Sequence, residues 1–260
     1  MSTRKNGNGT RPARTIVCIN KSKTDLGVGF KRLISALQTF VDEHFAPVWG
    51  TSARLVVRTK PVTGAWHMWF LDHADHAREL KRKEGLVLGK HYFNGRPCAK
   101  VFVNAILEAR EHVSVAASHE LAEMLVDPRN NRWIAGPKGL HYAFETSDPV
   151  EEVKFRVDGL PMCDFVYPAY FQASPGSNSI QLDHKKKIKK PFEILPGGFL
   201  VTRKGKNGKK VIMKFRSKDK ERRFNEEDRR LHRSQFRAAL VARNSRKAAT
   251  NGMVTIRLQP

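Results

Sequence analysis

The chain has 260 residues, which suffice for one large domain or for a domain with a small added module. Hydrophobic residues make up 40% of it, so a buried core can form, while no apolar run approaches the roughly 20 residues that cross a bilayer. The three cysteines, Cys18, Cys98 and Cys163, lack paired CxxC spacing and are odd in number. These features argue against a membrane span, a zinc-thiolate knot and a disulfide framework, and they favour a reducing, cytoplasmic compartment.

The formal net charge of +23 is unevenly distributed along the chain. Residues 185–260 contain 24 Lys and Arg against 6 Asp and Glu, a net of +18, so the preceding residues carry only +5. Such a concentration attracts polyanions through counterion release, although a run of charge is also a common solubilising surface. Nucleic acid or another polyanion is therefore a candidate partner of this segment.

The first half of the chain alternates strand-like and helical patterns. Residues 1–12 are basic and small, without the apolar stretch of a secretory signal, and we expect a disordered arm there. The β-rich run 15–20 predicts the first strand. Apolar residues at helical spacing from Leu33 to Phe45 predict a helix that ends before Pro47. Further candidate strands are 52–59, 66–71 and 100–104.

The second half begins with a helix over 113–126, which ends at Asp127 because a residue before proline is pushed out of the helical region. Strand-like segments at 142–146, 153–157 and 165–171, then a loop at 172–183, follow it. An Asn-Gly pair predicts a hairpin between 199–203 and 209–215, and a capped helix over 225–243 comes next. The pattern predicts an α+β fold: a domain over 13–184 with a mixed sheet, and a basic hairpin-helix segment over 185–260.

The helix over 113–126 carries a metal-site motif, HExxE. His119 and Glu123 are four residues apart, so both side chains project from one helix face and can reach one ion. Glu120 is turned by about 100° from His119, toward water at that ion rather than the ion itself. This is the HExxH metallopeptidase pattern with glutamate in place of the second histidine. A carboxylate can bind Zn²⁺, and three protein ligands plus water is the usual catalytic set.

The third ligand is expected from the acidic segment 145–152, with Asp148 and Glu145 as candidates and Asp127 as a weaker one. A structural interpretation stays open, because short motifs recur by chance. In that case His119 is a hydrogen-bonded core histidine and Glu123 a surface carboxylate.

A second group of histidines and aspartates lies upstream. Its members match no closed set of metal ligands, and surface polarity is the preferred interpretation. They are His67, Asp72, His73, Asp75, His76 and His91.

Several short sequence segments accompany the HExxE motif: those at 38–41 and 46–50, SHELAEMLVDP at 118–128, YAFETSDPVE at 142–151, DGLPMCDFVYPAYF at 158–171 and PFEILPGG at 191–198. In this order they resemble an uncharacterised zincin-like family of bacteria and phages over about residues 15–202. The helix is also similar to one in plant exordium-like proteins, and segment 167–170 to the substrate-pocket wall of matrix-metalloprotease-like enzymes.

The resemblance implies a zincin-like domain with zinc bound by His119, Glu123 and an acidic residue near Asp148, and with Glu120 as general base. It also implies that Tyr167 and Tyr170 line a substrate pocket. Besides Glu123 in place of the second histidine, the sequence departs from these patterns at two further positions. Arg129 stands where those proteins have a third histidine, and Val166 stands where they have methionine.

Two classes of function follow. The leading hypothesis is a zinc-dependent hydrolase, a metallopeptidase acting on peptides, in which Glu120 takes a proton from water at the ion. The alternative is a nucleic-acid-binding or virion-associated structural protein that uses the zincin-like scaffold without catalysis. A third possibility combines the metal site with a polyanion-binding surface. The basic residues expected on that surface are Lys185, Lys186, Lys187, Lys189, Lys190, Lys209, Lys210, Arg229, Arg230, Arg233 and Arg237.

Overall fold

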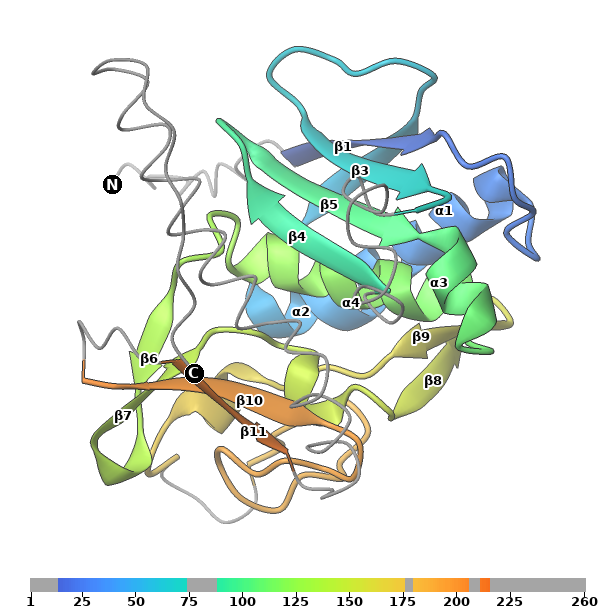
Figure 1. Cartoon of the computed structure of the whole chain (residues 1–260). Coiled ribbons are helices and arrows are strands. Elements are labelled where there is room, and N and C mark those ends of the chain that lie inside the picture. Colours follow the sequence, from blue (N-terminus) through green and yellow to red (C-terminus); the bar gives the residue numbers. More distant parts are fainter. Residues whose placement is uncertain (1–13, 74–87, 176–179, 206–210, 216–260) are drawn as a thin grey trace, which may run out of the picture.

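The computed structural model describes residues 14–73, 88–175, 180–205 and 211–215, and its largest element is a five-stranded mixed sheet (Figure 1). The strand order is β2-β1-β3-β5-β4. Four strands run parallel, and β4 lies antiparallel to β5 at one edge. The strands are β1 (Arg14–Asn20), β2 (Ala53–Val57), β3 (Trp66–Leu71), β4 (Gly89–Phe93) and β5 (Pro97–Phe102). The described part is therefore a mixed fold of helices and strands with a mixed sheet, as the sequence pattern indicated.

The first helical segment runs further than predicted. Helix α1 (Phe30–Thr39) continues through a π-helical turn at Phe40–Phe45 into α2 (Ala46–Trp49). The expected end before Pro47 is wrong, because proline is accommodated in the first turn of α2, where its missing N–H costs no hydrogen bond. The segment ends instead at Gly50, whose φ of 61° is left-handed.

Helix α4 (Val113–Val126) has the predicted bounds, and all of its residues are buried. It contacts β4 and β5 of the large sheet on one side and β9 (Leu160–Cys163) on another, and it also packs against α1 and α3 (Val103–Glu108). Figure 1 shows α4 between the five-stranded sheet and the lower elements. A polar side chain on this helix therefore needs a partner inside the protein. Among the described residues, no helix combines the length and apolar character that crossing a membrane requires.

Three strands were not predicted, and the strand predicted at 165–171 is absent. The sequence pattern did not indicate β4, β9 and β6 (Trp133–Ala135). The strand expected at 100–104 is present as the end of β5, but it gives way to α3 after Phe102. β9 pairs with β8 (Lys154–Val157) around the predicted Asp158-Gly159 turn. The aromatic run 165–171 is not a strand: only Val166 forms an isolated bridge, and Pro168–Phe171 is a 3-10 turn. Proline at the start of that turn cannot donate to a ladder.

A second sheet joins the C-terminal segment to the preceding chain. Its order is β11-β10-β7-β6, in which β10 (Phe199–Lys204) and β11 (Val211–Phe215) form the predicted antiparallel pair. β10 also pairs with β7 (Leu140–Ala143), and Leu200 lies in the main core. The division expected after residue 184 did not anticipate this continuity. The predicted arm at 1–12 and helix at 225–243 lie outside the described residues.

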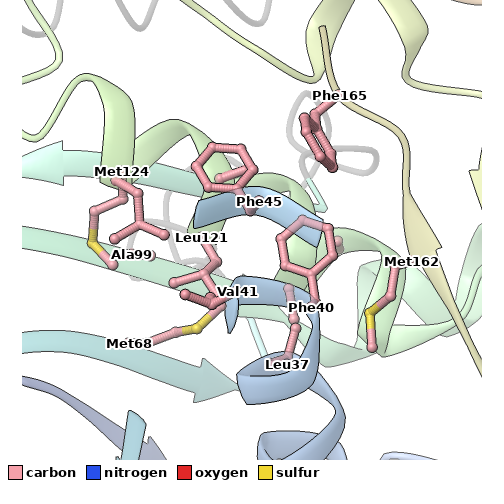
Figure 2. Close-up of a cluster of buried hydrophobic side chains, with 14 of the residues drawn as sticks. Leu37, Phe40, Val41, Phe45, Met68, Ala99, Leu121, Met124, Met162 and Phe165 are labelled. Atoms are coloured by element: carbon pink, nitrogen blue, oxygen red, sulfur yellow. The ribbon is translucent and has the colours of Figure 1, made fainter. Parts of the chain in front are cut away.

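The core connects the large sheet to the rest of the described chain through α1 and the π-helical turn that follows it. Figure 2 shows Met68 and Ala99 of the sheet, Phe40 and Phe45 of the turn, and Phe165 from beyond β9. The Phe165 ring lies 4.9 Å from Phe45 and 5.7 Å from Phe40, measured between centroids, in edge-on contacts. These contacts fix the segment after β9 beside the helices.

Asp164 and Asp183 form a fully buried pair of carboxyl groups. Asp183 accepts hydrogen bonds from the backbone N–H groups of Lys187 and Ile188 at 2.9 and 2.8 Å. Burial, followed by the neighbouring Asp183, raises the pKa of Asp164 to about 8. Asp164 therefore keeps its proton in the folded protein over a pH range in which the unfolded chain has released it.

This shift predicts that the contribution of Asp164 to the free energy of unfolding falls as the pH rises from about 4 to about 8. Asp164→Asn, which is polar but uncharged, should therefore be more stable relative to wild type at pH 8 than at pH 5. Urea unfolding at both pH values measures the difference, with the exposed Asp158→Asn as control. An equal difference at both pH values would contradict the raised pKa.

Candidate metal centre

The structure brings His119, Glu123 and Asp148 together. The Nε2 atom of His119 lies 3.1 Å from Oε1 of Glu123 and 3.2 Å from Oδ1 of Asp148. Asp148 is delivered by a 3-10 turn, Asp148–Val150, which follows β7. All three side chains are buried, and their ligand-type atoms lie close enough to share one metal ion. Asp148, the first of the two candidates for the third ligand, therefore occupies the expected position.

The separations in this group suit a tetrahedral ion. Two nitrogen or oxygen ligands bound at 2.0–2.1 Å to a tetrahedral Zn²⁺ stand about 3.3 Å apart. The observed 3.1 and 3.2 Å are close to this value. Nε2 of His119 also forms no hydrogen bond with any group in the described part of the chain. A buried nitrogen that faces two carboxylate oxygens at these distances fits a metal ion, and the three residues can therefore hold one.

The second ring nitrogen of His119 is held from β9. Sγ of Cys163 lies 3.7 Å from Nδ1 of His119, and the backbone N–H of Cys163 donates to Oγ of Ser118 at 2.8 Å. One turn earlier, Ser114 donates to the carbonyl oxygen of Pro161. The small side chains on this face of α4 thus let β9 approach closely and fix the orientation of the imidazole.

A second group surrounds His91 on β4. Nδ1 of His91 lies 3.3 Å from Oε2 of Glu123 and 3.5 Å from Oε2 of Glu120, and the histidine is 1% exposed. Asn130, just after α4, donates to the carbonyl oxygen of His91 at 2.7 Å and ties β4 to the end of that helix. The sequence-based interpretation of His91 as a surface residue is wrong, because β4 directs it between the sheet and α4.

The remaining acidic candidates take other places. Oε2 of Glu145 lies 3.5 Å from Nε2 of His91, so the second candidate for the third ligand faces the other histidine. Asp127 accepts the backbone N–H of Arg132 at 2.8 Å and stabilises the turn after α4. Asp72, considered for an upstream site, accepts the backbone N–H groups of Lys23 and Thr24.

Glu120, the expected general base, is packed against β4. A Cβ atom at position 89 would lie 2.7 Å from Cγ of Glu120, so glycine there permits the close approach. The carboxylate is 3% exposed and faces His91. Glu120 is therefore part of the same buried cluster as Glu123.

Without a cation, the carboxylates favour protonated imidazoles. Burial by itself lowers the pKa of His119, but Glu123 and Asp148 raise that pKa well above its usual value. Burial likewise opposes charge on His91, yet carboxylates led by Glu145 raise its pKa to about 10. In the opposite direction, the two imidazoles overcome burial and hold the pKa of Glu123 well below its usual value. Metal binding at these nitrogens has to displace the protons.

The expected substrate-pocket tyrosines lie differently. Tyr170 is fully buried and donates from its hydroxyl to the carbonyl oxygen of Glu193 at 2.8 Å. The predicted pocket-wall role is therefore wrong for Tyr170, which is a core residue. Tyr167 is partly buried and stacks on Phe165 at 5.9 Å, with its hydroxyl 3.3 Å from Nδ1 of His184.

The expected basic surface is described only in part. Its first five lysines, at 185–187 and 189–190, are all exposed. The other predicted members lie outside the described residues: Lys209, Lys210, Arg229, Arg230, Arg233 and Arg237.

No protein-family model, no curated protein and no solved structure matches the chain at a significant level. The zincin-like resemblance therefore stays a prediction, and the geometry of the two histidine groups carries the functional argument.

Replacement of the histidine on α4 tests the first group. The protein is stripped of metal with a chelator and then reloaded with zinc. After this treatment, His119→Ala should bind one equivalent of zinc less than wild type, because the nitrogen ligand is lost. The measurement is metal content by mass spectrometry after dialysis. His67→Ala is the matched control, since His67 is 5% exposed and its Nε2 accepts the backbone N–H of Val62, outside both groups. Equal zinc in wild type and His119→Ala would contradict the site.

Proposed function

We propose that this protein is a zinc-dependent hydrolase of the metallopeptidase type, with the ion held by His119, Glu123 and Asp148. The observation that carries the proposal is the convergence of one imidazole nitrogen and two carboxylate oxygens at 3.1 and 3.2 Å inside the protein. Three ligands from one histidine and two carboxylates leave a fourth position for water, as in catalytic rather than structural zinc sites.

A zinc ion bound by these residues would act as a Lewis acid, which would polarise a carbonyl group and lower the pKa of water. The chain supplies ligands, orientation and a second acidic group. His119 is oriented by Cys163 and Asp148 by its turn, so the ligands are held before an ion arrives. In a one-ion centre, Glu120 is the carboxylate available as general base, one residue from the histidine ligand.

Loss of the third ligand tests the hydrolase. Asp148→Asn should lower cleavage by at least about 100-fold, because even outer partners of metal ligands are worth 10–100-fold. Zinc-loaded protein is assayed against a quenched-fluorescent peptide library. Asp158→Asn, which removes an exposed carboxylate bonded to Thr39, is the matched control and should retain activity. Absence of cleavage by wild type, with zinc bound, would contradict the peptidase proposal.

A second candidate function is polyanion binding, favoured by the five exposed lysines of segment 185–190. Ile188 within the segment is buried, and Asp183 holds the backbone N–H groups of Lys187 and Ile188. The lysines are therefore displayed from a fixed backbone. Phosphate contacts of this kind give affinity without base reading and a strong dependence on salt.

Neutralising these five lysines with glutamine should weaken binding of duplex DNA. It should also reduce the slope of log affinity against log salt by about one for each phosphate that a lysine no longer neutralises. Fluorescence anisotropy at several salt concentrations measures both. The control replaces five scattered exposed lysines, which removes the same charge: Lys21, Lys23, Lys31, Lys60 and Lys138. Equal losses in both variants would show that net charge, and not this segment, attracts the DNA.

A further inference from the structure

We propose that the protein binds two divalent cations side by side, the second held by His91, Glu120 and Glu123, with Glu123 bridging the pair. This inference rests on the ion proposed above, since the two sites share Glu123. Each group of three residues brings ligand atoms together closely enough for one ion.

The two oxygens of Glu123 face different histidines. Oε1 lies 3.1 Å from Nε2 of His119, whereas Oε2 lies 3.3 Å from Nδ1 of His91. A carboxylate placed in this way can bind one ion with each oxygen. Ions bridged like this stand about 3.5–4 Å apart, as in two-metal hydrolytic centres.

His91 itself points to a cation. It is 1% exposed, and neither of its ring nitrogens forms a hydrogen bond within the described part of the chain. Yet three carboxylate oxygens lie within 3.3–3.5 Å of those nitrogens. In the absence of an ion, these contacts pair a protonated imidazole with carboxylates, and the same buried atoms are placed to become ligands when a cation displaces the proton. Ligand separations around a shared ion lie in this range without hydrogen-bond geometry.

Both histidines have an outer partner on the nitrogen that faces away from the shared glutamate. Nε2 of His91 faces Glu145 at 3.5 Å, and Nδ1 of His119 faces Cys163 at 3.7 Å. Metal-binding histidines are commonly oriented in this manner, with a carboxylate as the outer group. Glu145 is therefore a positioning residue for the second ion rather than an alternative ligand for the first.

The charges of the cluster also favour two ions. Its two histidines bind metal as neutral imidazoles, and its four carboxylates carry one negative charge each. Two divalent cations with both imidazoles neutral balance the four carboxylates, whereas one cation beside a protonated His91 leaves one negative charge. Uncompensated charge is costly where Glu120, Glu123 and Asp148 are no more than 3% exposed.

The second ion changes the role of Glu120. In the one-ion centre this residue is the base, whereas with two ions its carboxylate would be a ligand, and the ions would supply the lowering of the pKa of water. Gly89 allows the arrangement, because any side chain there would displace Glu120 from β4. The two roles predict different effects of the same substitution.

Metal stoichiometry distinguishes the roles. Chelator-stripped protein titrated with Zn²⁺ should bind two equivalents in wild type and one in His91→Asn and Glu120→Gln, while His67→Asn still binds two. A base at position 120 would leave the stoichiometry of Glu120→Gln unchanged. One equivalent in wild type that persists in both variants would overturn the second site.

Manganese provides a measurement that tests the bridge in the wild-type protein itself. Wild type loaded with Mn²⁺ should show the electron paramagnetic resonance spectrum of a spin-coupled pair, and Glu120→Gln that of a single ion. Two uncoupled ions in wild type would overturn the bridge. If wild type hydrolyses substrate with only one zinc bound, the second site is refuted and the hydrolase proposal stands. If wild type binds two ions but hydrolyses nothing, the hydrolase proposal is refuted and the two-ion site stands.

Discussion

The burial of carboxylates against α4 is the constraint on which the rest of this structure depends. Glu120 and Glu123 lie on a helix that is covered all round, and Asp148 approaches from outside it. Removing an ionised carboxylate from water costs several kcal/mol unless another charge compensates it. The two histidines, or cations bound with them, supply that compensation. Without that compensation, burying a helix with these carboxylates would destabilise the folded protein.

Three neighbours of α4 contribute residues to this buried cluster. The large sheet carries His91 on its edge strand β4, the segment after β7 carries Glu145 and Asp148, and β9 carries Cys163. The arrangement depends on close approach, which Gly89 allows on one side of α4 and the serines of that helix allow on the other. The close packing that holds the fold around α4 therefore also positions the residues of the candidate metal centre.

Local sequence determined the first half of the site. The i, i+4 spacing of His119 and Glu123 follows from helical geometry alone, and the acidic segment after the helix supplied Asp148. His91 could not be found in this way, because no local spacing relates it to α4 and its strand was not predicted. Tyr170 was misassigned because an aromatic sequence motif does not reveal whether its side chains are buried or which groups they contact. The positions of His91 and Tyr170 depend on tertiary contacts, which local sequence patterns do not show.

The central claim is that a cation binds between His119, Glu123 and Asp148, and the most direct test is a crystal structure of the zinc-loaded protein with an anomalous difference map at the zinc absorption edge. We expect a peak about 2 Å from Nε2 of His119 and from the facing oxygens of Glu123 and Asp148. A map without a peak there, from crystals soaked in zinc, would contradict the claim. In that case the imidazoles hold the carboxylates as charged partners, and the cluster is structural.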